Sequence, residues 1–314
     1  MWQAIGRTDL GLLGDLDNLL VRVQERDQTR FPTFDPSDSL IIASDYSGEH
    51  KQSVLYCYAF LITTHRSVMM WHAECQELRR HSALRKRRMA FKSLRDGVRQ
   101  RVLPRYLGVA GALHGILVTL LVDKRLESLF EHAANLDMSR PEFAPYAHWR
   151  APSLEKLLRV THVLGFLVAG MSRPMQDVLW VTDQDEIAAN PERLAELTSV
   201  FGTVTSHLSP HNLGHLRVAT TASDPGDLSL EDLTAIPDLA AGAIAECFCR
   251  YDETETTPES ALIVPAPTST STKSRMVMNW LSDRRKRLHL LTVTLGRDDQ
   301  GLKYWRHYVL HGSQ

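Results

Sequence analysis

Three aspartates each follow a short apolar run of the chain directly: Asp45 after residues 39–44, Asp123 after 116–122 and Asp183 after 178–182. Runs of this length and composition are typical of buried strands. If the three strands lie side by side and parallel, their carboxylates meet at one edge of the sheet. A fourth aspartate, Asp238, is expected in the first turn of a helix rich in small residues.

Converging carboxylates need a partner of opposite charge. Two unit charges about 4 Å apart repel by roughly 4 kcal/mol at an effective dielectric near 20. Magnesium or manganese suits carboxylate oxygens, and a pair of such ions can activate water and stabilise a departing oxygen in phosphodiester hydrolysis. The sequence therefore predicts a metal-dependent nuclease site in which Asp45, Asp123 and Asp238 hold the metals and Asp183 is a further ligand or positions a water.

Asp185 and Glu186 stand beside Asp183 and are candidates for an additional ligand or a water-orienting group. The structural alternative is simpler, because an aspartate at a strand end most often caps the following helix. It applies most directly to Asp183, while Asp238 would favour a helix dipole. Four such residues in one chain favour the metal site, with all four aspartates catalytic and Asp185 added to the metal ligands.

A cationic stretch precedes the strand that carries Asp123. Residues 82–103 are expected to form one helix that ends at Pro104. Five basic side chains recur on it at three- and four-residue steps: Arg85, Arg88, Lys92, Arg95 and Arg99. Such a stripe is often only a solvated face. Its place next to a carboxylate-bearing strand favours contact with nucleic-acid phosphates.

Other chemistries find less support in the sequence. His207, His211 and His215 have the spacing of a metal-binding helix face, but Pro210 and Gly214 interrupt that helix, so a polar loop is expected. The chain has no nucleophile elbow and no glycine-rich phosphate loop. Its four cysteines include no Cys-x-x-Cys pair, which is typical of a reducing compartment.

Bulk composition describes an ordinary globular protein. The chain has 314 residues, of which 43% are hydrophobic, and 36 basic residues balance 37 acidic ones. Any surface that binds a polyanion must therefore be local. The first residues lack the design of a signal peptide, and no apolar run is long enough to span a bilayer. We expect a soluble cytoplasmic protein with no membrane partner.

The expected elements place the carboxylates in one α/β domain. A meander of three strands (39–44, 54–62 and 67–72) precedes the helix at 82–103, followed by alternating strands and helices as far as the helix at 236–246. The predicted division has four parts: residues 1–38 as an N-terminal helix and connector, 39–251 as the main domain, 252–274 as a linker or long loop, and 275–314 as a C-terminal helix and β-hairpin packed on the main domain.

This order resembles the ribonuclease-H-like fold and, more narrowly, the domain of unknown function 3800 family. The resemblance covers roughly residues 39–250 and is carried by four short motifs: Asp-Tyr-Ser-Gly at 45–48, Val-Asp-Lys at 122–124, Thr-Asp-Gln-Asp-Glu at 182–186 and Ile-Pro-Asp-Leu-Ala-Ala-Gly at 236–242. The family's first motif typically reads Asp-Glu-Ser-Gly. Tyr46 replaces that glutamate here, so its contact is lost or moves, with Glu49 a candidate.

The resemblance implies a mixed five-stranded sheet flanked by helices, with catalytic carboxylates at the first and fourth strand ends and on the last helix. It also implies a nuclease, often in a bacterial defence or mobile-element setting, and does not choose between DNA and RNA.

Two alternatives to a nuclease stay open at this point. The first is a catalytically inactive subunit that binds nucleic acid, a protein partner or a second copy, with the N-terminal helix and C-terminal hairpin as docking surfaces. The second is a nucleotide hydrolase of the actin-like type, which lacks support because the chain has no repeated glycine-rich phosphate loops.

Overall fold

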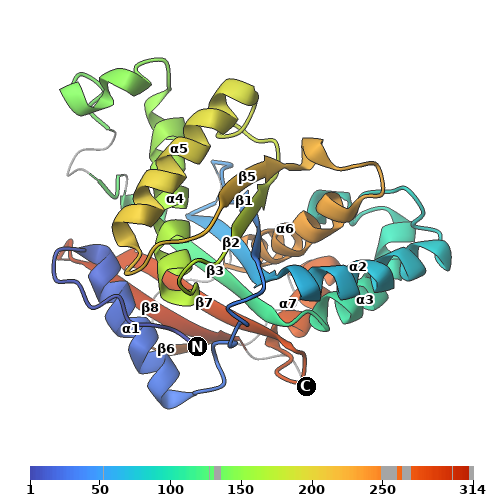
Figure 1. Cartoon of the computed structure of the whole chain (residues 1–314). Coiled ribbons are helices and arrows are strands. Elements are labelled where there is room, and N and C mark those ends of the chain that lie inside the picture. The colour runs from blue at the N-terminus through green and yellow to red at the C-terminus, as the bar shows by residue number, and fades with distance from the viewer. Residues whose placement is uncertain are drawn as a thin grey trace.

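One sheet of eight strands runs through the molecule (Figure 1). The computed structural model describes residues 1–51, 53–126, 128–130, 136–248, 260–263, 270–298 and 300–310. The order across the sheet is β5-β4-β1-β2-β3-β7-β8-β6. The strands are β1 (Leu40–Ser47), β2 (Leu55–Thr64), β3 (Gly115–Asp123), β4 (Val178–Thr182), β5 (Leu216–Thr220), β6 (Ser260–Ile263), β7 (Leu288–Arg297) and β8 (Lys303–Leu310).

The first five strands lie in the order β5-β4-β1-β2-β3, and β3 takes the place in the meander that was predicted for residues 67–72. β1, β2 and β3 form an antiparallel meander, while β4 lies parallel to β1 and β5 parallel to β4. The predicted fold class, a mixed sheet flanked by helices with an added C-terminal helix and hairpin, is confirmed, but the sheet has eight strands instead of the predicted five. The hairpin also continues the main sheet, because β7 pairs with β3 in parallel over eight residues.

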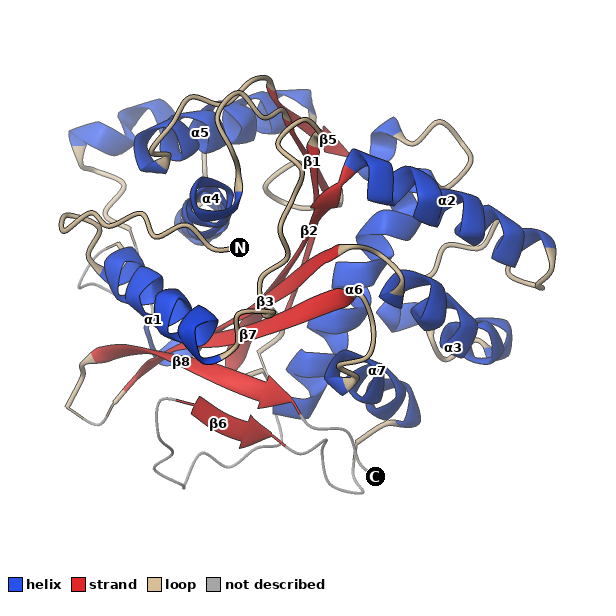
Figure 2. Cartoon of the chain, turned by 60° about the horizontal axis from the view of Figure 1, so that its bottom comes forward, coloured by secondary structure: helices blue, strands red, loops and turns tan. Residues whose placement is uncertain are grey.

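Helices cover both faces of the sheet (Figure 2). On one face lie α1 (Leu12–Arg26), α4 (Ala151–Met171) and α5 (Pro191–Leu208), and on the other α2 (His65–Arg80), α3 (Gly97–Gly111), α6 (Ser229–Phe248) and α7 (Thr272–Ser282). Four short 3-10 helices complete the described part of the chain: η1 (Phe91–Ser93), η2 (Lys124–Leu126), η3 (Pro141–Tyr146) and η4 (Thr221–Ser223).

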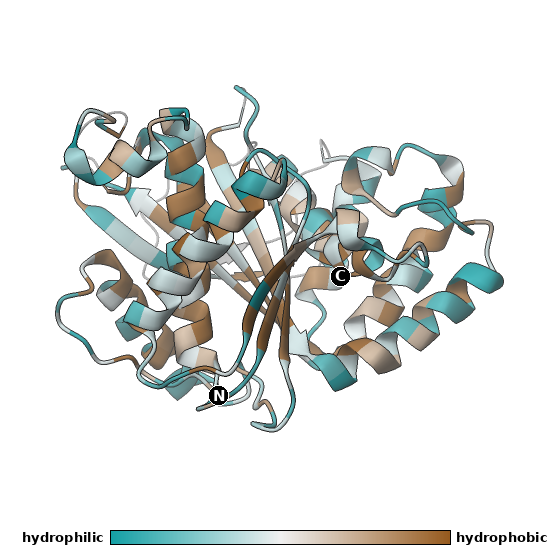
Figure 3. Ribbon diagram, turned by 45° about the horizontal axis from the view of Figure 1, so that its top comes forward, coloured by the Kyte–Doolittle hydropathy of each residue, from teal (hydrophilic) through white to brown (hydrophobic). Residues whose placement is uncertain are grey.

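Two hydrophobic cores result from the alternation of side chains along each strand. In β1, Ile42 packs with the core under α4, and Ile41 and Ala43 pack with the core under α6. Figure 3 shows the apolar strands enclosed between helices whose outer surfaces are more polar. The strands are therefore apolar on both faces, which is why they are recognisable as continuous apolar runs in the sequence.

Two predicted elements between β2 and β3 are wrong. Residues 67–72 lie in α2 and are not a strand; the buried positions Trp71, Cys75 and Leu78 have helical spacing, and the Thr64 side chain caps the helix. The predicted helix at 82–103 is also absent. After α2 the chain turns through η1, and α3 begins behind Asp96, which caps it, and contains Pro104 in its interior. Arg85 to Arg99 therefore do not form one helical stripe.

Asp238 lies deeper in its helix than expected. α6 begins at Ser229, so Asp238 is more than two turns from its start, next to the internal Pro237. The alternative role of Asp238 as a first-turn residue interacting with the helix dipole therefore does not apply.

The ends of the described chain pack onto the same body. Trp305 of β8 donates its indole N–H to the Leu12 carbonyl at 2.6 Å, and the Asp17 carboxylate accepts the indole N–H of Trp2 at 2.8 Å. β6 lies inside the predicted linker at 252–274, and α7 begins at Thr272. The other residues of that linker, 252–259 and 264–269, lie outside the described residues.

Candidate active site

Asp45 and Asp183 lie next to each other at the carboxyl ends of two adjacent parallel strands. Ser44 of β1 is in register with Thr182, the last residue of β4. Asp45 is the next residue of β1, which continues to Ser47, and Asp183 directly follows β4. The alternation of side chains points Asp45 to the same face as Ala43, which α6 covers. Asp238 on α6 comes to this group, because α6 packs across β1 and β2.

Asp45 is the most perturbed of these carboxyl groups. Burial raises its pKa well above the usual value, and the negative charges of Asp238, Asp183 and Asp185 raise it further, while Lys156 acts in the opposite direction. Among the described residues, Asp45 makes no hydrogen bond and no ion pair. Its oxygens are therefore not committed to a protein donor.

Asp238 is held by the backbone of η1. Its carboxylate accepts the Phe91 N–H at 2.6 Å. Burial raises the pKa of Asp238 and outweighs this hydrogen bond and the charge of Arg88, with Asp183 adding to the rise. Gly242, one turn further along α6, permits this approach: a Cβ there would lie 2.3 Å from the Phe91 ring.

Asp183 has several donors. It accepts the Thr221 hydroxyl at 2.8 Å and the Gln184 N–H at 2.9 Å, and the Arg88 guanidinium lies 2.9 Å from its other oxygen. Burial alone would raise the pKa of Asp183, but the Thr221 hydrogen bond and the charge of Arg88 together hold it below the usual value. Arg88 also pairs with Glu231 at 2.5 Å.

Asp185 is paired with a lysine from the opposite face of the sheet. Lys156 of α4 is only 8% exposed, and its ammonium lies 2.7 Å from Asp185 and 3.5 Å from Glu186. It also pairs with Glu49 and lies over the Tyr46 ring, 4.9 Å from the centroid. Burial raises the pKa of Asp185, although Lys156 opposes the rise.

Asp123 does not join this group. β2 separates β3 from β1, and across β2 Asp45 is opposite Ala59 while Asp123 is opposite Leu55. Four residues of strand correspond to an offset of roughly 13 Å. Asp123 instead accepts the Arg125 N–H at 2.8 Å and pairs with the Arg125 guanidinium at 2.5 Å. The expectation that three parallel neighbours carry the aspartates is thus met only by β1 and β4.

The five predicted basic residues have different surroundings. Arg88 contacts the carboxylates, and the Arg99 guanidinium donates to the Arg88 carbonyl at 2.8 Å, which supports the loop. The charge of Lys92 lies near enough to Asp238 to lower the pKa of that carboxyl group. Arg85, Lys92 and Arg95 are exposed.

Sequence reasoning missed two cations beside the site. Lys273 of α7 lies over the Phe91 ring, 3.7 Å from its centroid, and donates to the Phe91 carbonyl at 3.3 Å. Lys156 is the second. A lysine inside the apolar helix at 154–171 was the available signal for it, because such a residue needs a buried partner.

A divalent ion fits the donor set but is not enclosed by it. The candidate ligands are all carboxylate oxygens, which magnesium and manganese prefer, and no described residue donates a hydrogen bond to Asp45. In the described parts of the chain, no three histidine, cysteine, aspartate or glutamate side chains are grouped closely enough to hold one ion. Ligation by Asp183 or Asp185 requires Arg88 or Lys156 to release an oxygen.

The three histidines are not gathered into a metal site. α5 ends at Leu208, so His211 and His215 follow the helix, and the His211 ring lies 3.1 Å from the Ser172 hydroxyl. The described cysteines, Cys57, Cys75 and Cys247, are buried, and Cys249 lies outside the described residues.

Comparison with known proteins gives a faint structural likeness. No protein family and no curated protein matches the chain, so the resemblance to the domain of unknown function 3800 family stays a prediction. Among solved structures, the chain is similar to ribonuclease H2 from Pyrococcus horikoshii OT3, with 9% identity and a TM-score of 0.36 over 76% of this chain and 85% of that one. This likeness carries no argument about activity.

None of the helices described is both long and apolar enough to cross a membrane.

Proposed function

We propose that this protein is a divalent-metal-dependent nuclease that hydrolyses phosphodiester bonds of DNA or RNA. The observation that carries the proposal is the position of Asp45, which has no donor in the described chain and is surrounded by the charges of Asp238, Asp183 and Asp185. Asp45, Asp183 and Asp238 would hold Mg²⁺ or Mn²⁺, with Asp185 as a further ligand.

The electrostatics of the site favour a cation. The raised pKa values of Asp45 and Asp238 mean that ionising both in the same place is costly. A bound divalent ion would remove this cost and would supply water activation and stabilisation of the departing oxygen. Asp123, which lies elsewhere on the sheet, is not part of the proposed site.

Basic side chains around the proposed carboxylate site support a polynucleotide substrate. Arg88 contacts Asp183, while the exposed Lys92 and Arg95 and the partly buried Lys273 lie around η1, which donates to Asp238. Phosphates of a nucleic acid strand that reaches Asp45 would pass these cations. Because phosphate contacts carry no base information, they leave the choice between DNA and RNA open.

Two variants test the proposal. Asp45→Asn removes the central charge at constant size, and Asp123→Asn removes a carboxylate that the sequence also predicted to be catalytic. Calorimetric titration with Mn²⁺, followed by cleavage of labelled single- and double-stranded DNA and RNA, should show loss of binding and cleavage in Asp45→Asn and retention of both in Asp123→Asn.

The opposite pattern, or wild-type protein that binds no Mn²⁺ at millimolar concentration, would refute the proposed site. Nucleic-acid binding that needs neither Mn²⁺ nor the Asp45 carboxylate would instead support the inactive binding subunit.

A further inference from the structure

A polar cavity lies far from the carboxylates. It has a volume of about 110 Å³ and lies between the segment that follows α1 and the turn that joins α7 to β7. At about 30 Å³ per water in the liquid, it has room for roughly three or four waters, the scale of one small anion. β7 begins at Leu288, opposite Gly115 at the start of β3, so the cavity is at the opposite end of the strands from Asp45.

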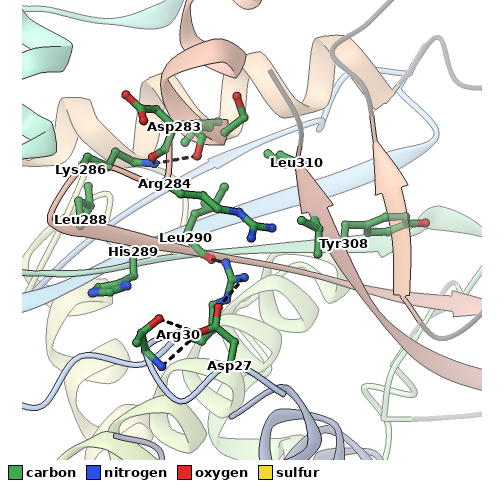
Figure 4. Close-up of a pocket in the computed structure, with 14 residues that line it drawn as sticks. Asp27, Arg30, Asp283, Arg284, Lys286, Leu288, His289, Leu290, Tyr308 and Leu310 are labelled. Atoms are coloured by element: carbon green, nitrogen blue, oxygen red, sulfur yellow. Dashed lines mark hydrogen bonds and ion pairs between the residues drawn. The ribbon is translucent and has the colours of Figure 1, made fainter. Parts of the chain in front are cut away.

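Two arginines from distant parts of the chain meet in this cavity. Figure 4 shows the side chains of Arg30 and Arg284 reaching into the same space from its two sides. The Arg30 side chain is only 15% exposed; it donates to the Leu290 carbonyl at 3.2 Å and pairs with Asp27 at 3.1 Å. Its Nε is buried and has no hydrogen-bond partner in the described part of the chain.

Arg284 supplies a second guanidinium charge at the cavity, near the Asp27 carboxylate. It is exposed and makes no hydrogen bond or ion pair with another described residue. Burial lowers the pKa of Arg30, Asp27 opposes this, and the nearby charge of Arg284 lowers it further. Two guanidinium groups are thus held close enough to repel each other.

Lys286 adds a third cation at the cavity wall. Its ammonium donates to the carbonyls of Leu281 and Asp283 at 2.8 and 2.7 Å, which occupies two of its three donors, and lies 5.6 Å from the centroid of the Trp280 ring. Burial lowers the pKa of Lys286 to about 8, against the effect of Asp283 and with that of Arg30. The Asp283 carboxylate is already paired with Arg285 at 2.9 Å, and that of Asp27 with Arg30.

We propose that this cavity binds a phosphate group between Arg30 and Arg284, with Lys286 as a third donor. Three cations face two carboxylates that already have partners, and the buried Arg30 Nε–H has no acceptor among the described residues. A phosphate oxyanion would supply acceptors to both arginines and relieve their repulsion. The source is either a free phosphate or nucleotide or the backbone of a nucleic acid strand.

The test compares two adjacent arginines. Arg284→Gln removes a cavity charge, and Arg285→Gln removes an equal charge from a side chain that is 91% exposed and does not line the cavity. Calorimetry of the full chain with inorganic phosphate should show saturable binding that Arg284→Gln weakens by about 10-fold or more, the loss expected for a charge-assisted hydrogen bond. Arg285→Gln should leave it within about 2-fold.

The source of the phosphate is read from a second titration with a short single-stranded oligonucleotide in the presence of EDTA. Weaker oligonucleotide binding by Arg284→Gln, with Arg285→Gln unchanged, would assign the cavity to nucleic acid. An effect on inorganic phosphate alone would assign it to a small ligand.

Equal losses in both variants would show only a general charge effect and would overturn the proposal. The proposal would also be overturned if the wild-type protein bound no phosphate at about 10 mM and if its oligonucleotide binding did not depend on Arg284. Asp45→Asn should bind phosphate normally, so failure here and failure of the proposed nuclease site are separate results.

Discussion

At the scale of single residues, the carboxyl group proposed to bind the metal, Asp45, also lowers the stability of the metal-free fold. Its folded-state pKa is raised, so the folded protein binds more protons than the unfolded chain between the ordinary carboxyl pKa and the raised one. The free energy of unfolding therefore falls as pH rises through that window. The ionised Asp45 carboxylate therefore destabilises the metal-free folded protein at the position proposed to hold the metal.

The first prediction is that Asp45→Asn raises the melting temperature of the metal-free protein at pH 7 to 8. The amide has no charge to bury, and the difference from wild type should shrink as pH falls toward 4, where Asp45 is protonated. Thermal melts across this pH range in EDTA check it. A variant that is less stable than wild type at pH 8 would contradict the account of Asp45.

A second residue-scale prediction concerns Lys156→Met. Removal of the ammonium leaves Asp185, Glu49 and Glu186 without their shared cation. We expect a loss of roughly 2 kcal/mol, less than for a fully buried pair because the acidic partners are 24% to 52% exposed. Urea denaturation measures it. The matched control is Arg80→Gln, whose pair with Glu77 is exposed and should be worth about 0.5 kcal/mol or less.

At the scale of elements, contact between η1 and α6 determines where Asp238 is held. The Phe91 ring occupies the space over Gly242, and the Phe91 N–H donates to Asp238. We predict that Gly242→Ala costs about 1–3 kcal/mol, since the new methyl overlaps the ring, and that it weakens Mn²⁺ binding by displacing this donor.

Gly202→Ala is the control for Gly242→Ala, because a Cβ at this α5 position meets nothing within 4 Å and alanine is the better helix former. It should stabilise the protein by about 0.5–1 kcal/mol. Denaturation and Mn²⁺ titration of both variants separate the packing effect from helix propensity. Equal stability of the two variants would contradict the predicted contact.

The strands were largely predictable from the sequence, but their neighbours were not. The apolar runs that became β1, β2, β3 and β4 are recognisable because both faces of these strands are buried. Which strand pairs with which depends on contacts between distant segments, which a local pattern does not contain. The assumption that the three strands are parallel neighbours placed Asp183 beside Asp45 correctly, but it misplaced Asp123.

Local propensity also failed where two patterns compete. Residues 67–72 contain several β-formers, yet the longer helical spacing from Trp71 to Leu78 determines the structure. The basic residues from Arg85 to Arg99 have helical spacing, but they do not lie on one continuous helix. Asp96 lies within this stretch and caps a new helix, α3.

At the scale of the whole molecule, the C-terminal segment is part of the main sheet. β7 pairs with β3, and Leu291, Val293 and Leu295 are buried in the core that α4 covers. We predict that a chain that ends at residue 274 does not fold, whereas the full chain unfolds in one transition by both tryptophan fluorescence and circular dichroism. A truncated chain with a cooperative transition of its own would instead support the four-part division of the sequence.

The order of the strands has a consequence for behaviour in concentrated solution. The outermost strands, β5 and β6, have only five and four residues, while the long apolar strands β2 and β3 lie inside. Short edges offer few free backbone groups to a neighbouring chain, and the exposed Arg217 in β5 adds a charge that a stacked copy would have to accommodate. The fold thus limits edge-to-edge aggregation at β5, the edge nearest the proposed active site.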